Sequence, residues 1–176
     1  KLVNVMTSEI YPADVAVYGD TIVAVDQDVS MHIGPETQVI EAEGKYLAPG
    51  LIDGHIHSEC SKLSNTGFAK AVVLCGTTSI VSGLDEYISV GGLEALKEVF
   101  EEIKGVPLRV FWGAPYRTPY TVPQSTVAFN FTKEVHAQVQ QWPECYGVWE
   151  TVREFVNECD DDTLGAIALA SKNRLP

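Results

Sequence analysis

The chain has 176 residues, of which 45% are hydrophobic, and carries a formal net charge of −12 at pH 7. This length suits one ordinary core, or a small module beside part of a larger domain. The acidic balance disfavours nucleic acid as a partner, and no apolar run approaches the roughly 20 residues that cross a bilayer. Since no secretory signal is visible either, we expect a cytoplasmic globular protein with no membrane partner.

The N-terminal part, residues 1–46, has the pattern of a small β-sheet module. Gly19 and Asp20 stand between two runs rich in β-branched residues, which is typical of a hairpin turn. Strands are expected over residues 2–6, 13–18, 21–25 and 39–41. The chain starts with Lys1 rather than Met inside a strand-like run, which suggests a piece excised from a longer protein.

From residue 45 onward, strands and helices alternate. The nearly continuous apolar run over residues 46–52 predicts a strand buried on both faces. The clearest helix is predicted over residues 92–104, because apolar side chains recur there at helical spacing. Further strands are expected over residues 77–81, 108–112 and 146–149, and further helices over 65–74, 132–141 and 163–171.

Two connecting segments after strands have distinct patterns. Residues 113–123 are rich in proline and aromatic residues, which predicts a loop at the end of a strand, where ligands are often contacted. Thr151 and Glu154 have the spacing of a capping box that starts a helix. Four strand-helix units in this order favour an α/β fold with a parallel sheet, so residues 47–176 are predicted to form the first half of a (β/α)8 TIM-type barrel.

The strongest chemical signal is the pair of histidines at the end of the first of these strands, His55 and His57. Side chains alternate faces along an extended strand, so both imidazoles are expected on one side, with Asp53 just upstream. Glu150 ends the fourth strand at the same predicted rim. Two imidazoles and a carboxylate suit zinc, manganese or iron, which would lower the pKa of a bound water for hydrolysis.

Less specific interpretations compete with each of these assignments. A His-x-His pair occurs by chance in many chains, and Glu150 could be a solvated charge near a helix N-terminus. Glu59 could be an ordinary surface carboxylate, and the four scattered cysteines read as reduced, mostly buried thiols.

The segment from Ala48 to His57, placed after a β module, resembles the amidohydrolase superfamily. Within that superfamily, several stretches are similar to the adenine deaminase family. They are Val3-Asn4-Val5, Glu9-Ile10-Tyr11, His55-Ile56-His57-Ser58-Glu59-Cys60-Ser61, Phe68-Ala69-Lys70-Ala71-Val72 and Gly76-Thr77-Thr78. The similarity is good over residues 1–112, moderate to Glu150 and weak beyond it.

This resemblance implies that residues 1–46 belong to a small β-sandwich fused to a metal-dependent (β/α)8 barrel. It implies a centre of two divalent ions, Mn, Fe or Zn, with His55, His57 and Glu150 as ligands and Glu150 at the place where related enzymes use a carboxylated lysine. Asp53, Glu59, Glu86 and Arg117 are expected to orient these ligands or contact the substrate.

Two features depart from the family pattern. Where adenine deaminases usually carry Asp-Pro-His-Glu, this chain has Gly83-Leu84-Asp85-Glu86, which loses the histidine and keeps Glu86. The remaining metal histidines and the catalytic aspartate would lie beyond Pro176, so no catalytic residue is identified within the chain.

The resemblance therefore predicts a metal-dependent hydrolase of purine metabolism, in which a metal-activated water attacks C6 of adenine and releases ammonia, leaving hypoxanthine. The full-length protein is expected to be a homo-oligomer acting on a purine base, and the isolated fragment to be inactive. Two alternatives stay open: an amidohydrolase acting on a hydantoin-like or imidazolone-like ring, and a non-catalytic scaffold relative.

Overall fold

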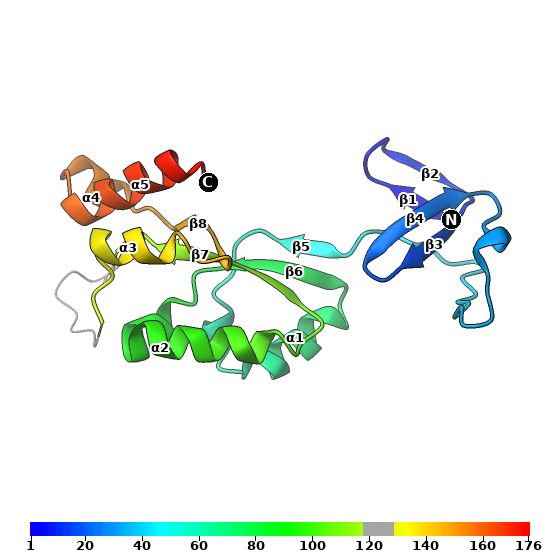
Figure 1. Cartoon of the computed structure of the whole chain (residues 1–176), viewed down its shortest axis with the longest axis horizontal. Coiled ribbons are helices and arrows are strands. Elements are labelled where there is room, and N and C mark those ends of the chain that lie inside the picture. Colours follow the sequence, from blue (N-terminus) through cyan, green and yellow to red (C-terminus); the bar gives the residue numbers. More distant parts are fainter. Residues whose placement is uncertain (118–128) are drawn as a thin grey trace. The chain divides into compact units, whose positions relative to one another are not determined.

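The computed structural model describes residues 1–117 and 129–176 of the chain (Figure 1). It divides into two compact units, Lys1–Pro49 and Gly50–Pro176. The predicted loop over residues 113–123 therefore lies partly outside the described residues. Among the described residues, no helix combines the length and apolar character needed to cross a membrane.

The first unit consists of two short antiparallel ribbons. Strand β1 (Leu2–Asn4) pairs with β2 (Glu9–Tyr11), and β3 (Asp14–Tyr18) pairs with β4 (Thr21–Asp26). Gly19 has a φ of +63°, as the predicted hairpin turn between β3 and β4 requires. The unit contains β structure, but none of its residues is buried. Its membership of a β-sandwich therefore stays a prediction.

Two predictions in this unit are wrong. Residues 39–41 form no strand, and β2 was not predicted. Strand β2 is only three residues long and is exposed at two of them, so its sequence lacks the apolar run on which strand prediction depends. A 3-10 turn, η1 (Ser30–His32), follows β4.

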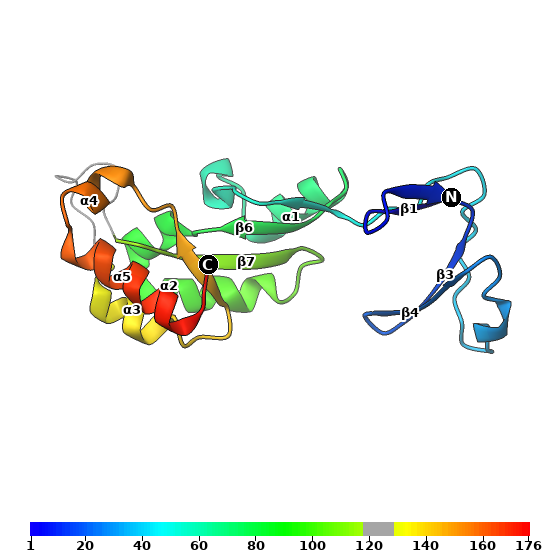
Figure 2. The same ribbon diagram turned by 90° about the horizontal axis from the view of Figure 1, so that it is seen from above.

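The second unit is built on a four-stranded parallel sheet with the order β5-β6-β7-β8. Strands β6 and β7 run side by side in Figure 2. The strands are β5 (Leu51–Asp53), β6 (Thr77–Ser82), β7 (Arg109–Pro115) and β8 (Cys145–Trp149). The helices are η2 (Ser58–Ser61), α1 (Asn65–Val73), α2 (Asp85–Ile103), α3 (Lys133–Val139), α4 (Arg153–Asn157) and α5 (Asp161–Asn173). The predicted α/β class with sequential parallel strands is confirmed.

The strand predicted over residues 46–52 is much shorter in the structure and is not buried on both faces. The backbone of Val3 donates a hydrogen bond to the carbonyl of Leu47, so this part of the run pairs with β1 in the first unit. Strand β5 begins only at Leu51 and lies at the edge of its sheet. Leu51 and Ile52 are 62% and 69% exposed, because an edge strand is covered on fewer sides than an internal one.

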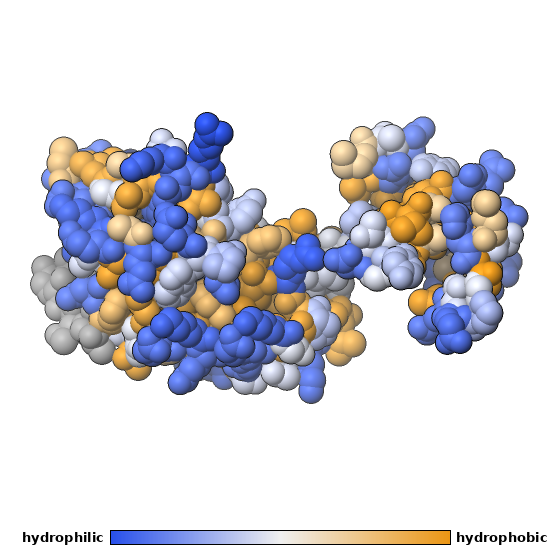
Figure 3. All heavy atoms as spheres, viewed as in Figure 1, coloured by the Kyte–Doolittle hydropathy of each residue, from blue (hydrophilic) through white to orange (hydrophobic). Residues whose placement is uncertain are grey.

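The core of the second unit lies between the sheet and helices α2 and α3. Leu96 and Phe100 of α2 pack against Trp112 of β7, and Val139 of α3 belongs to the same buried cluster. Trp112 also donates its indole N–H to the carbonyl of Gly83, at 2.7 Å. The side chains of Glu94, Glu98 and Glu101 on α2 are exposed, and Figure 3 shows hydrophilic residues along the outer side of this helix.

Several element boundaries differ from the sequence-based ones. Helix α2 begins at Asp85, seven residues before the predicted start, and contains a break at Gly92. Strand β7 continues to Pro115, where a loop was predicted. Helix α4 begins after Val152 without a side-chain cap, so the prediction of a capping box from Thr151 and Glu154 is wrong. All four cysteines are free, but Cys145 alone among them is buried.

Candidate metal centre

The turn that carries the two histidines begins directly after β5. Because the strand ends at Asp53, His55 and His57 lie beyond it rather than within it, and the strand alternation expected from the sequence does not place them. Instead, Oδ1 of Asp53 accepts a hydrogen bond from the backbone N–H of His55, at 3.1 Å. Asp53 therefore shapes the turn through the backbone of His55 rather than through its imidazole.

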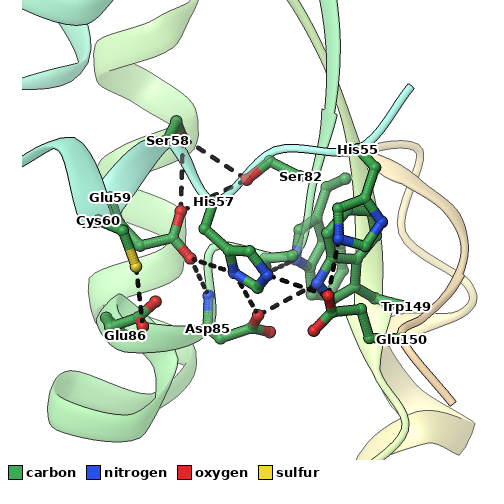
Figure 4. A network of polar contacts seen from close by, with 12 residues as sticks. His55, His57, Ser58, Glu59, Cys60, Ser82, Asp85, Glu86, Trp149 and Glu150 are labelled. Carbon is green, nitrogen blue, oxygen red and sulfur yellow. Dashed lines mark hydrogen bonds and ion pairs between the residues drawn. The ribbon is translucent and has the colours of Figure 1, made fainter. Parts of the chain in front are cut away.

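One carboxylate oxygen joins the two histidines, as Figure 4 shows. Oε1 of Glu150 lies 2.7 Å from Nε2 of His55 and 3.0 Å from Nε2 of His57. The side chains of His55, His57 and Glu150 are 57%, 26% and 24% exposed, so this cluster is open to solvent on one side. The structure therefore brings together the three side chains predicted as metal ligands.

The backbone of Glu150 is in an unusual conformation. Its φ is +42°, in the left-handed region that residues with a β-carbon rarely adopt. Helix α4 begins only at Arg153, so Glu150 does not belong to its first turn. From its position at the end of β8, the Glu150 carboxylate points to the two histidines. This disfavours the interpretation of Glu150 as a charge on a helix N-terminus.

A second layer of side chains lies behind His57 (Figure 4). Oδ2 of Asp85 lies 3.4 Å from Nδ1 of His57, and the indole of Trp149 donates its N–H to the same oxygen, at 3.1 Å. The ring of Trp149 stacks on that of His55, with 4.4 Å between the centroids and 27° between the planes. Asp85 and Trp149 thus contact the histidines directly.

Glu59 is the most enclosed carboxylate near the histidines after Asp85, with a side chain only 3% exposed. Its Oε1 lies 3.7 Å from Nδ1 of His57 and accepts the backbone N–H of Asp85 at 2.9 Å. The hydroxyls of Ser58 and Ser82 lie 3.4 Å from its Oε2. Glu59 is therefore not the ordinary surface carboxylate that the sequence left open.

These neighbours change the acid-base properties of the cluster. Burial and the adjacent Glu86 raise the pKa of Glu59 to about 7. Burial opposes protonation of His57, but the hydrogen bond and charge of Glu150, with the charges of Asp85 and Glu59, raise the pKa of His57 overall. Accumulated negative charge around an imidazole is also what favours a divalent cation at the same place.

Of the last two predicted residues, Glu86 has a carboxylate oxygen within 4.8 Å of a ring nitrogen of His57, whereas Arg117 makes its contacts elsewhere. Glu86 accepts a hydrogen bond from the thiol of Cys60 at 3.4 Å and borders the cluster through Glu59. Arg117 pairs with Asp160 at 2.6 Å, and its guanidinium lies 4.5 Å above the ring of Phe155. These contacts give Arg117 a role in joining the end of β7 to the helices that follow β8.

Sequence reasoning missed Asp85 and Trp149 as members of the site. Asp85 follows β6 and Trp149 ends β8, so both stand at the carboxyl ends of parallel strands, the edge where such sheets place their chemistry. That position was the available signal. The family pattern has histidine at the position of Asp85, and a tryptophan within a strand is usually part of the core, so neither residue was predicted.

The donor set fits a divalent metal ion. Ligand atoms of His55, His57 and Glu150 lie within 4.8 Å of one another. Two further groups of such atoms share His57, one with Cys60 and Glu86 and the other with Glu59, Asp85 and Glu86. Imidazole and carboxylate donors together suit zinc, manganese or iron.

The fold and this cluster define an α/β protein with a candidate metal centre at the carboxyl ends of parallel strands. Its sequence is similar over nearly its whole length to curated bacterial proteins, while no protein-family model matches it. The chain is similar to the N-terminal portion of proteins named adenine deaminase, as its sequence motifs indicated.

Three relatives carry this similarity. Adenine deaminase 1 of Desulfotalea psychrophila is 72% identical over 99% of the chain and 29% of the relative. Adenine deaminase 1 of Latilactobacillus sakei is 61% identical over 100% of the chain and 30% of the relative. Adenine deaminase 4 of Rhizobium meliloti is 58% identical over 100% of the chain and 29% of the relative. The chain thus spans less than a third of the length of the curated relatives it matches.

Proposed function

We propose that the full-length protein containing this chain hydrolyses adenine to hypoxanthine and ammonia, as an enzyme of purine metabolism. The observation that carries this proposal is the convergence of His55, His57 and Glu150 on one point, with both Nε2 atoms within 3.0 Å of one carboxylate oxygen. The choice of adenine as the substrate rests on the relatives named adenine deaminase.

His55, His57 and Glu150 would hold the metal, in a centre of two Mn, Fe or Zn ions. When bound, such a centre supplies Lewis-acid activation of water near neutral pH. Asp53 holds the turn that presents His55, and Glu59 and Asp85 lie behind His57. The further metal histidines and the catalytic aspartate are proposed to lie outside these 176 residues.

We also propose that residues outside this chain complete the barrel. The backbone N–H of Val148 in β8 donates to the carbonyl of Pro176 at 2.9 Å, so the chain after α5 returns to the outer edge of β8. A following segment that continues along this edge would be the fifth strand of a (β/α)8 barrel whose first half is residues 47–176. Residues 1–46 would then belong to a β-sandwich, and the whole protein would be a cytoplasmic homo-oligomer without nucleic-acid or membrane partners.

The test uses the full-length protein, its Glu150→Gln variant and a control, Glu98→Gln, which makes the same charge change on the exposed face of α2. Ammonia release from adenine is measured with Mn(II) or Fe(II). Loss of several kcal/mol of metal assistance should lower the rate of Glu150→Gln by about 100-fold or more, whereas Glu98→Gln should resemble the parent protein.

A substrate panel separates the alternatives. Asp85 stands where the family pattern has histidine, and this difference favours including hydantoin-like and imidazolone-like rings beside adenine. Cleavage of such a ring without ammonia release from adenine would overturn the deaminase proposal. A protein purified without stoichiometric metal, and not rescued by adding it, would support the scaffold alternative.

A further inference from the structure

We infer that Asp85 is a positioning residue that fixes the orientations of both candidate metal-binding histidines, His57 by direct contact and His55 through the ring of Trp149. This inference rests on the proposed metal centre. Asp85 was not among the ligands or substrate contacts expected from the sequence, and its role is to act through the histidines rather than on the substrate.

The contact with His57 sets which imidazole nitrogen is available. Nδ1 of His57 faces Oδ2 of Asp85 at 3.4 Å, while Nε2 faces Glu150 at 3.0 Å. A carboxylate beside Nδ1 favours the tautomer that carries its proton there, which leaves the Nε2 lone pair directed at the metal position. Glu59 also faces Nδ1, but from 3.7 Å, so Asp85 is the nearer carboxylate.

The same carboxylate oxygen reaches His55 indirectly. The indole N–H of Trp149 donates to Oδ2 of Asp85 at 3.1 Å, which fixes the rotation of the indole ring. That ring stacks on His55, whose side chain is otherwise more than half exposed. Because an exposed imidazole has several rotamers to lose, a fixed stacking partner lowers the entropy cost of presenting it to a metal ion.

Asp85 is itself held firmly. It is 1% exposed, and its backbone N–H donates to Glu59 at 2.9 Å. It follows Leu84, whose φ of +56° turns the chain sharply between β6 and α2, and it begins α2, where the helix dipole stabilises a carboxylate. Because Asp85 is buried beside His57, its removal should alter the orientation of the histidine rings rather than the protein surface.

The test measures metal affinity by chelator competition with Zn(II) or Mn(II) in the full-length protein. The variants are Asp85→Ala, Asp85→Asn and Trp149→Phe, with Glu98→Gln as the matched charge control on α2. Loss of the carboxylate behind a ligating histidine typically weakens metal binding about 10-fold to 100-fold, and we expect this for Asp85→Ala. Trp149→Phe keeps an aromatic ring but loses the N–H, so its loss should be smaller.

Circular dichroism and the melting temperature without metal show whether each variant folds. If Asp85→Ala does not fold, the isosteric Asp85→Asn decides, since it retains the shape and loses the charge. A merely structural role would lower the melting temperature and leave the metal affinity of the folded protein unchanged. As a second readout, Co(II)-substituted protein should change its visible spectrum in Asp85→Asn and not in Glu98→Gln.

The outcomes separate this inference from the function on which it rests. Folded Asp85 variants with parental metal affinity and an unchanged Co(II) spectrum would overturn the inference, while deamination of adenine by the parent protein would still stand. Weakened metal binding by the Asp85 variants, in a protein that acts on another ring, would support the inference and overturn the proposal of adenine as substrate. A parent protein that binds no metal would overturn both.

Discussion

At the scale of single residues, Glu59 is a carboxyl group whose ionisation is opposed by its surroundings. Its pKa is raised to about 7, against 4.5 for the unperturbed group, chiefly by burial and by Glu86. Between these two values the folded state binds more protons than the unfolded state, so this group lowers the free energy of unfolding as pH rises. This loss of stability is absent below about pH 4.5 and complete above about pH 7.

We therefore predict that Glu59→Gln stabilises the metal-free protein at pH 8 and has little effect at pH 5. Glutamine retains an acceptor for the backbone N–H of Asp85 and cannot ionise. The gain at pH 8 should be about 1 kcal/mol or more, after allowance for water that reaches the carboxyl group. Thermal unfolding in the presence of a chelator measures it.

The matched control is Glu98→Gln, which removes the same charge from the exposed face of α2. It should leave the pH dependence of unfolding unchanged. A stability difference between Glu59→Gln and the parent protein that is equal at pH 5 and pH 8 would contradict the assignment of a raised pKa to Glu59.

The sequence predicted three side chains that the structure brings together, while their role as metal ligands stays a prediction. His55, His57 and Glu150 were singled out because they follow predicted strands at one expected rim of the sheet, where barrel enzymes place their chemistry. Arg117 was assigned to the site from its loop, but its ion pair with Asp160 depends on a helix 43 residues away. Asp85 was missed, although it follows a strand, because the family pattern carries histidine at this position.

At the scale of elements, helix α2 depends on a glycine at its break. Gly92 has φ +64° and ψ −153°, a conformation essentially restricted to glycine, and an added β-carbon would lie 2.9 Å from the ring of Phe129. We predict that Gly92→Ala destabilises the protein by about 2 kcal/mol or more. Chemical denaturation of the full-length protein measures this.

Gly67 in α1 provides the comparison, because it has helical geometry and an added β-carbon would lie 3.3 Å from Ser64 Oγ, a tight contact that a small shift of this hydroxyl relieves. Gly67→Ala should be neutral or stabilising by up to about 1 kcal/mol. Equal effects of the two substitutions would show that the break at Gly92 is not required for the fold.

The junction of β7 with α5 depends on Asp160. Its carboxylate accepts the backbone N–H and the hydroxyl of Thr163, at 2.9 and 2.6 Å, which caps α5, and it pairs with Arg117. Asp160→Ala should cost about 2 kcal/mol, since it removes the cap and the ion pair, and Arg117→Ala about 1 kcal/mol. Metal affinity should be unchanged in both variants.

Denaturation and chelator competition on the same samples measure these two quantities. If Arg117→Ala instead raised KM for the substrate without loss of stability, Arg117 would regain the substrate-contacting role expected from the sequence. Asp161→Ala is the control, because that neighbouring carboxylate is 83% exposed and its pair with Lys133 lies on the surface.

Element prediction failed mainly where pairing across distance decides the outcome. The apolar run over residues 46–52 gives one continuous strand pattern, but Leu47 pairs with β1 and only Leu51 and Ile52 join β5. Helix α2 was predicted from its amphipathic part alone, since the preceding turn contains glycine and β-branched residues that weaken the periodic signal. The parallel order of the strands was predictable because alternating strands and helices allow few other arrangements.

At the scale of the whole molecule, the exposure of apolar side chains matches a chain that covers about 30% of its relatives. In the first unit, Ile10, Val17 and Ile22 are each more than half exposed, and Leu51 and Ile52 at the edge of the second unit are exposed as well. Under the function proposed above, the rest of the full-length protein would cover these surfaces and supply further metal ligands.

We therefore predict that the 176-residue chain alone binds Zn(II) or Mn(II) at least about 100-fold more weakly than the full-length protein and releases no ammonia from adenine. Three ligand side chains, of which His55 is more than half exposed, provide only part of a coordination shell. Chelator competition on both proteins in one buffer measures the difference. Equal affinity would mean that His55, His57 and Glu150 suffice for metal binding, and the missing residues would then be required for catalysis alone.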